Sequence, residues 1–178
     1  MRNLIFLSLL LGLFSCNTHP FEEEIEQVDS LSVVLDSLNE KLLTIDLEKT
    51  REIAKQSSDL QKYLSKNYPD TADREFWVNK MTPLYDVQRN LGKFLNGETE
   101  VKNELDYTIE QLKTLKNSLK DNKLTKEEAQ KYLDQEAKAV AQISYFLNKY
   151  YPRVNRSLRT WEDIHIEMQR IADSVKAL

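Results

Sequence analysis

Glycine and proline are scarce in this chain, which has three glycines and four prolines among 178 residues. β-Sandwiches and chains of βαβ units need many more turn-forming residues than this. Charged residues make up 30% of the sequence, and apolar residues recur at steps of three and four. Together these features predict an all-α fold, specifically an antiparallel helical bundle.

The chain also lacks the residue patterns of catalytic sites. It has no glycine-rich phosphate loop, no nucleophile elbow, only two histidines and one cysteine. The 25 basic and 29 acidic residues alternate in sign and leave a formal charge of -4, so no basic stripe is available for nucleic acid. The sequence therefore predicts a protein that is not an enzyme, binds no nucleic acid and uses no cofactor.

One long apolar run is present, at residues 4–14 after Arg2, and it is too short to span a bilayer. It ends in Leu-Phe-Ser-Cys at residues 13–16, which resembles a bacterial lipobox with a small residue before the lipidated cysteine. We therefore predict that residues 1–15 are a signal peptide and that Cys16 carries a lipid anchor. The alternative is an ordinary secretory signal followed by a chance cysteine.

Cys16 is the only cysteine, so no intramolecular disulfide can form. Asn17 follows it, in place of the aspartate that resembles an inner-membrane retention signal, which favours an outer-membrane lipoprotein facing the periplasm or the cell surface. The acidic run Glu22-Glu23-Glu24 resembles a surface-export signal. The favoured reading is the first turn of a helix, where carboxylates favour the positive end of the helix dipole.

The last third of the chain, residues 125–178, carries the longest heptad seam. Apolar residues follow one another there at alternating steps of four and three, and only Ser144 and His165 interrupt them. This pattern predicts a long helix packed along partner helices, and a shorter seam of the same kind runs through residues 28–45. The apolar positions of the long seam are Leu133, Ala137, Val140, Leu147, Tyr151, Val154, Leu158, Trp161, Met168, Ala172 and Val175.

Turn and cap residues divide the chain into helices. Pro69 ends a first helical stretch, residues 22–67, because proline cannot continue a helix. Within that stretch Asp46 either caps a new helix or lies on a continuous one. A threonine–glutamate capping box at Thr125 begins the last helix. Pro152 is expected to kink that helix without ending it, because the heptad register continues across the proline.

Two shorter helices are expected between these long ones. Gly97 predicts the end of a helix at residues 72–96, and Thr99 predicts the start of the next at residues 99–121. Pro83 should kink or restart the first of them, with its preceding threonine as a cap. At about 1.5 Å per residue these helices reach only some 35–40 Å, so they would cover only part of the outer helices.

These lengths predict a single helical domain, residues 22–178, attached by a tether at residues 16–21. A four-helix head would comprise about residues 46–152, and an antiparallel coiled-coil stalk would pair residues 22–45 with residues 153–178. The alternative is a compact bundle in which both stalk segments fold back at the junction.

Three arginines on the last helix, Arg153, Arg156 and Arg159, are candidate contacts for an acidic partner or for lipid headgroups. Pairing with Asp36 and Glu40 across the stalk is the favoured reading, and such surface pairs contribute little stability.

Two other candidate sites lie on the last helix. Glu162 and His165 form half of the Glu-x-x-His arrangement of di-iron bundles, but a second copy is lacking, so a packed histidine is favoured over a metal ligand. Five aromatic residues suggest either a ligand groove near the junction or, the favoured reading, a filled core: Tyr145, Phe146, Tyr150, Tyr151 and Trp161.

The lipobox, the stretch VDSLSVVLDSLNEKLLTID and the stretch LKTLKNSLKDNKLTKEEAQKYL together resemble small all-helical lipoproteins of Bacteroidetes-type bacteria. The resemblance implies a bacterial cell-envelope protein and carries no activity. Two functions are expected: a non-catalytic lipoprotein that presents a helical bundle to an unknown envelope protein, or a lipid-anchored carrier of an apolar small molecule or metal.

The lipid-anchor assignment predicts that Cys16→Ala moves the protein from the membrane fraction to the soluble fraction. The substitution removes the only thiol that a lipid can modify. Fractionation of cells expressing each form, followed by immunoblotting, measures this. A variant that stays with the membrane would show that the tether is assigned wrongly.

Overall fold

The computed structural model describes residues 19–177, which contain five helical elements and no β-strand. The all-α prediction is therefore confirmed. None of the helices in this part of the chain is long and apolar enough to cross a membrane. The elements are α1 (Glu22–Leu43), α2 (Leu47–Asn67), a π-helix η1 (Phe76–Met81), α3 (Thr82–Lys120) and α4 (Lys126–Lys176).

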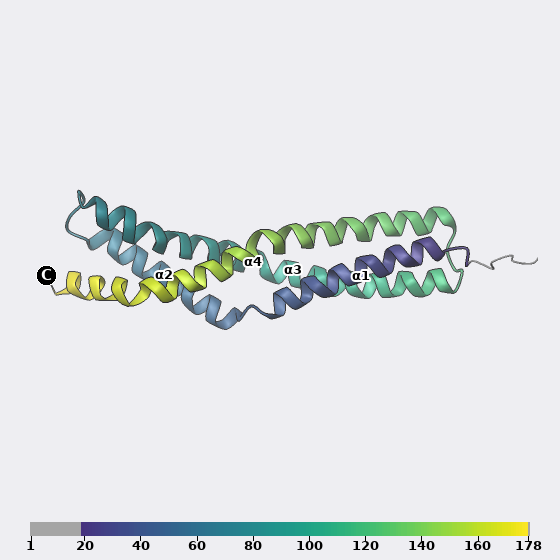
Figure 1. Cartoon of the computed structure of the whole chain (residues 1–178), viewed down its shortest axis with the longest axis horizontal. Coiled ribbons are helices and arrows are strands. Elements are labelled where there is room, and N and C mark those ends of the chain that lie inside the picture. The colour runs from purple at the N-terminus through teal and green to yellow at the C-terminus, as the bar shows by residue number, and fades with distance from the viewer. Residues whose placement is uncertain (1–18, 178) are drawn as a thin grey trace, which may run out of the picture.

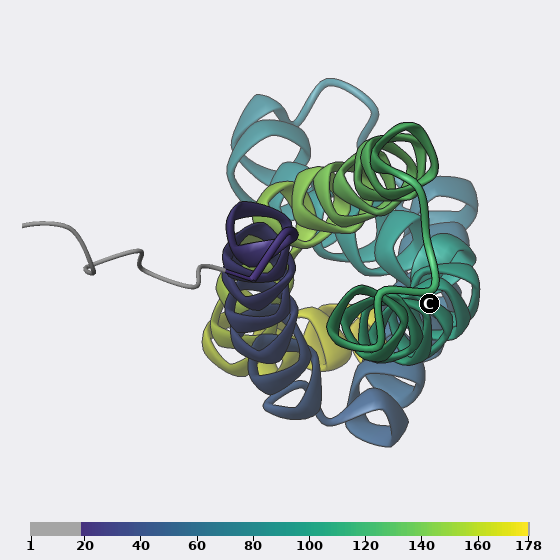
Figure 2. The ribbon, with the colours of Figure 1, turned by 90° about the vertical axis from the view of Figure 1, so that its right-hand side faces the viewer.

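These elements form three rods that lie side by side, as Figure 1 shows along the molecule and Figure 2 from one end. The first rod is α1 followed by α2, the second is η1 followed by α3, and the third is α4. Both α1 and α2 pack against α3 and against α4. The result is one elongated helical bundle.

Ion pairs between rods show their directions. Lys126 Nζ at the start of α4 lies 2.8 Å from Glu24 Oε1 at the start of α1. Farther along, Lys49 Nζ of α2 lies 3.0 Å from Glu162 Oε1 of α4. The first and third rods therefore run parallel, and α3 returns antiparallel to both.

The expected division into head and stalk is wrong. Thr44, next to the end of α1, donates a hydrogen bond to the Tyr151 hydroxyl at 3.3 Å, so α1 ends where the stalk part of α4 was expected to begin. The division fails because α3 does not end at Gly97: it is one helix of 39 residues that contains both Gly97 and Thr99. At 1.5 Å per residue it is about 58 Å long and covers both α1 and α2. A fold-back does not occur either, because α4 continues through Pro152.

Gly97 serves close packing and does not end a helix. A Cβ atom at this position would lie 2.6 Å from Cε2 of Phe146 on α4. The Phe146 ring also lies near Phe94, with ring centres 6.0 Å apart. The absence of a side chain at Gly97 therefore lets the Phe146 ring approach the backbone of α3.

The first and third rods both change at one level, as expected from Asp46 and Pro152. Asp46 caps a new helix, α2, because its Oδ1 accepts a hydrogen bond from Lys49 N at 2.9 Å. On α4, Pro152 provides no backbone N–H for the helical ladder, and the helix bends in its middle in Figure 1. The Thr44–Tyr151 hydrogen bond joins the two places.

The start and seam of α4 agree with the sequence. Thr125 Oγ1 accepts from Glu128 N at 3.2 Å, and Glu128 Oε2 accepts from Thr125 N at 2.9 Å, which is the predicted capping box. Most seam residues are buried, although Ala137 is exposed. A second buried stripe adds Ala129, Ile143 and Ser157, because α4 faces two rods and needs a wider apolar face than a two-stranded coiled coil.

The π-helix η1 leads directly into α3, which begins at Thr82 with Pro83 in its first turn, the position expected for a restart at Pro83. Met81 and Thr82 keep helical dihedral angles, and α3 follows η1 without a side-chain cap. Thr82 Oγ1 instead donates a hydrogen bond to the Trp77 carbonyl, at 3.4 Å.

The two glycines of α3 provide a matched pair of substitutions. Gly97→Ala should destabilise the bundle by about 1–3 kcal/mol, because its methyl group meets the Phe146 ring. Gly92→Ala meets nothing within 4 Å and should stabilise α3 by about 0.5–1 kcal/mol through helix propensity. Denaturant unfolding measures both effects. Combining Gly97→Ala with Phe146→Leu should recover part of the loss, and equal effects of the two alanines would contradict this account.

Candidate functional site

Cys16 lies outside the described residues, but the chain is fixed to the bundle soon after it. The Phe21 side chain is buried, and Lys126 Nζ lies 5.0 Å from its ring centre. The same ammonium group donates a hydrogen bond to Glu24, which lowers the pKa of the Glu24 carboxyl. Glu22 and Glu23 are exposed in the first turn of α1, as expected for an acidic helix start. Lys126 thus holds the entry of the chain into the bundle.

The three candidate arginines separate in the structure. Arg153 and Arg156 line an open groove of about 680 Å³ between α4 and the rod formed by η1 and α3, whereas Arg159 does not line it. Arg89 of α3 faces the same groove. We call this surface the arginine groove; its polar lining includes Arg89, Arg153, Arg156, Asn79, Thr82 and Thr160.

The expected pairing of these arginines with Asp36 and Glu40 is wrong. No ion pair of Arg153, Arg156 or Arg159 is present within residues 19–177. Both carboxylates lie on α1, which ends at Leu43 beside the Tyr151 level of α4. Arg153 lies over an aromatic ring, with its guanidinium carbon 5.9 Å from the ring centre of Tyr150. The structure therefore leaves these guanidinium groups facing solvent.

The Glu-x-x-His pair has structural partners. Glu162 forms the ion pair with Lys49 described above. His165 Nδ1 lies 2.9 Å from the Trp161 carbonyl oxygen, and the two rings stack with centres 5.5 Å apart. No group of three or more histidine, cysteine, aspartate or glutamate side chains that could hold a metal ion occurs in the part of the chain that the structure describes.

The aromatic residues of α4 do not form one groove. Tyr145 is 68% exposed. Phe146 and Tyr150 lie together, with ring centres 4.7 Å apart. Trp161 is buried, as the core reading expects, and it lines a different groove of about 480 Å³ between α2 and α4. Tyr63, His165 and Asp59 also line that groove.

An aromatic cluster at the turn between α2 and η1 was not predicted. The rings of Tyr68 and Phe76 stack with centres 3.5 Å apart, and Trp77 meets both edge-on. Asp73 holds this turn: Oδ1 accepts from Phe76 N at 2.9 Å and Oδ2 accepts from the Tyr68 hydroxyl at 2.7 Å. The signal in the sequence was an aspartate three residues before Phe76, the spacing of a helix cap.

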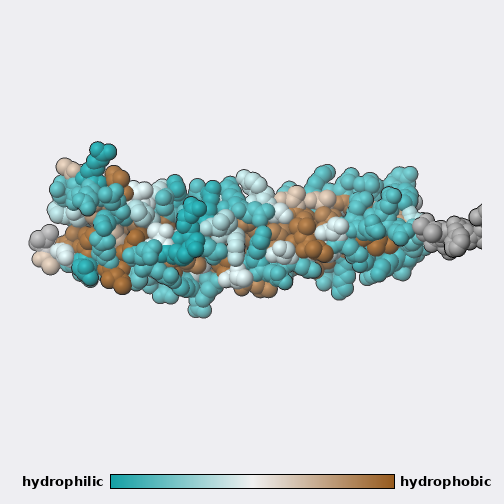
Figure 3. All heavy atoms as spheres, in the orientation of Figure 1, coloured by the Kyte–Doolittle hydropathy of each residue, from teal (hydrophilic) through white to brown (hydrophobic). Residues whose placement is uncertain are grey.

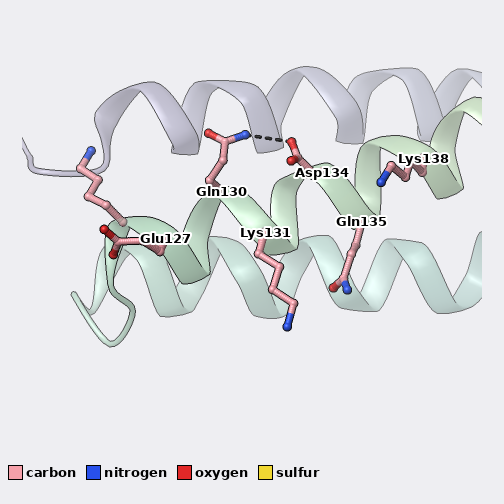
Figure 4. Close-up of a pocket in the computed structure, with 7 residues that line it drawn as sticks. Glu127, Gln130, Lys131, Asp134, Gln135 and Lys138 are labelled. Carbon is pink, nitrogen blue, oxygen red and sulfur yellow. Dashed lines mark hydrogen bonds between the residues drawn. The ribbon is translucent and has the colours of Figure 1, made fainter.

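Figure 4 shows a contrasting surface on the first part of α4. Glu127, Lys131 and Lys138 are exposed there, and Gln130 Nε2 donates to Asp134 Oδ1 at 2.9 Å. The labelled side chains alternate in sign and spread away from one another along the helix. They do not converge on a common point, so this face is a solvated helix surface.

Comparison of the chain with protein-family models, with curated proteins and with solved structures finds no match. Function is therefore inferred from the surfaces described above and from the N-terminal sequence. Among these surfaces the arginine groove is distinctive, because it concentrates one sign of charge on a chain that is acidic overall.

The Asp73 contacts predict an acid-sensitive turn. The hydrogen bond from the Phe76 backbone N–H has the largest effect in lowering the pKa of Asp73, and the hydrogen bond from the Tyr68 hydroxyl lowers it further. The hydrogen bond between Tyr68 and Asp73 also raises the pKa of Tyr68 to about 12. A carboxyl whose pKa is lowered on folding adds stability above its unfolded value of 3.8, and this stability is lost as pH falls through the folded pKa. Asp73→Asn should therefore lower Tm at neutral pH and differ progressively less from wild type below about pH 4.

Thermal unfolding followed by circular dichroism across this range measures the difference. Asp106→Asn is the control, because Asp106 is exposed on α3 and forms no hydrogen bond with the described residues. A Tm difference for Asp73→Asn that does not change between neutral pH and pH 3 would contradict the role of the Asp73 charge.

Proposed function

We propose that this protein is a non-catalytic lipoprotein of the bacterial cell envelope that presents its helical bundle for contacts with another envelope protein. The lipobox-like run at residues 13–16 supports the anchor, and the resemblance to Bacteroidetes-type lipoproteins supports the outer membrane. The observation that carries the contact role is the arginine groove. Arg153 and Arg156 there have no carboxylate partner within residues 19–177, so their charges are available to another molecule.

The length of the tether limits the distance between the lipid anchor at Cys16 and the start of the bundle. From Cys16 to the buried Phe21 the chain reaches at most about 18 Å at 3.6 Å per residue. The 51 residues of α4 extend about 75 Å, and Arg153 lies about 40 Å from the start of that helix. An upright bundle therefore holds the arginine groove well away from the anchoring membrane, which favours a protein partner over lipid headgroups.

Exposed apolar side chains add to the case for protein contacts. On α1, Val33 is 68% exposed and Val34 is 42% exposed. Val34, Leu31 and Leu133 line an open groove of about 570 Å³ between α1 and α4. Figure 3 shows apolar surface between the rods and polar surface over most of the remaining face. Such grooves suit contact with side chains of another protein.

A carrier of a small molecule is the second candidate. It is favoured by the groove between α2 and α4, where Tyr63, Trp161 and His165 place three rings beside polar groups. Aromatic walls with a few polar groups are typical of ligand sites. This groove is open and smaller than the arginine groove, so we rank the carrier below the contact role.

Site-specific photocrosslinking in intact cells tests the contact role. A photoreactive residue at Thr160, which lines the arginine groove, should give a discrete adduct with one envelope protein. The same residue at Lys131, on the solvated face of Figure 4, should give none. If no position on the bundle yields a protein adduct, the contact role is wrong. An adduct at Val34 or Tyr63 without one at Thr160 would support the contact role through a different surface.

A further inference from the structure

We propose that the arginine groove binds an extended, carboxylate-rich segment of the partner protein. This inference rests on the proposed contact function and adds the chemistry of the partner. It follows from the charge, the length and the walls of the groove.

The charge of the groove is basic on an acidic chain. Its lining contains three guanidinium groups, from Arg89, Arg153 and Arg156, and one carboxylate, from Asp86. Asp86 and Arg89 are paired with each other, because Asp86 Oδ1 lies 2.7 Å from a guanidinium nitrogen of Arg89, so the charges of Arg153 and Arg156 remain for a ligand. Arg153 and Arg156 are one helical turn apart on α4 and exposed. Planar guanidinium groups bind carboxylates through paired hydrogen bonds, which makes acidic side chains their matching ligands.

The length of the groove suits an extended segment. On the second rod its lining runs from Val78 to Asn90, which is about 18 Å at 1.5 Å per residue. Five residues in an extended conformation have about the same length. A single small oxyanion would instead require the guanidinium groups to converge, whereas Arg153 lies against the Tyr150 ring. The groove therefore matches a peptide better than a free ion.

The walls add specificity. The floor contains buried Val87 and buried Ser157, whose Oγ accepts a hydrogen bond from Asn90 at 3.4 Å. Pro83 and Val78 supply apolar wall, so an apolar residue next to the acidic ones would be accommodated.

The positive region has a defined end. Beyond Thr160 the exposed surface of α4 becomes acidic at Asp163 and Glu167, and Lys80 already pairs with Glu167 at 2.8 Å. The acidic residues of the bound segment should therefore lie toward Arg153 and Arg156, away from this end.

Binding of a defined probe tests this inference. The full chain, purified in a non-ionic detergent, is titrated into a fluorescently labelled hexapeptide of alternating glutamate and leucine, and anisotropy is measured at low ionic strength. Arg153→Gln and Arg156→Gln should each weaken binding by about tenfold, because each removes a charge-assisted hydrogen-bonding group. Arg159→Gln is the matched control: it removes the same charge from the same helix outside the groove, and should change affinity by less than about twofold.

Other outcomes would overturn the inference. Equal weakening by Arg159→Gln would show general charge attraction, and no binding by wild type would show that the groove does not take acidic segments. Inorganic phosphate that displaces the peptide at much lower concentration than acetate would indicate a small-anion site. Arginine-dependent binding to micelles doped with phosphatidylglycerol, without peptide binding, would indicate a headgroup site. Circular dichroism confirms that each variant is folded. A crosslinked protein at Val34 with no peptide binding would leave the contact role intact and reject this inference alone.

Discussion

The structure depends on covering the apolar face of α4 along all 51 of its residues. Isolated helices of this length gain little from propensity alone, so packing must supply the stability. The second rod provides most of this cover through α3, which continues for 39 residues without a break. The first rod provides the remaining cover in two pieces, α1 and α2. Every other feature, including the grooves between rods, follows from three helical rods wrapping one another.

Local signals in the sequence predicted the local structure. Thr125 and Asp46 act as helix caps, and Pro152 leaves α4 continuous. Each of these outcomes depends on atoms within one or two turns of the residue, which is why the sequence contains the information. The failure at Gly97 has the opposite cause. Its role depends on Phe146, a residue of a different helix, and a glycine suits a helix end and a close contact equally well.

That single residue changed the predicted architecture. A helix break expected at Gly97 implied two short middle helices. Short middle helices could cover only part of the long ones, so the strict heptads of residues 28–45 and 153–178 were expected to pair with each other. With α3 continuous, the first rod instead runs parallel to α4, with α1 beside its first half and α2 beside its second half. The same shift in register separated the arginines from Asp36 and Glu40. The sequence thus predicted that the three arginines lie on one helix. It did not predict that they form no ion pair within residues 19–177. The turn at Pro69 was predicted, but the contacts of Asp73 with Phe76 and Tyr68 were not, because they depend on how the chain folds back across that turn.

The arginine groove lies just beyond the level at which the first and third rods change. The first rod is interrupted between Leu43 and Leu47, and α4 lacks a backbone hydrogen bond at Pro152, so two of three rods are weakened at one level. Near that level, the buried Glu98 carboxylate of α3 is paired with Arg51 of α2 at 3.0 Å. Breaking such a pair leaves a buried charge without a partner, so α2 is held firmly to α3 where α1 has ended. The arginine groove lies between α4 and the rod formed by η1 and α3, and the hydrogen bond from Asn90 Nδ2 to Ser157 Oγ at 3.4 Å joins its two walls. The ion pair between Lys80 and Glu167 at 2.8 Å joins the same two rods farther along. The walls of the groove are therefore held to each other directly, and the interruption of the first rod lies outside them.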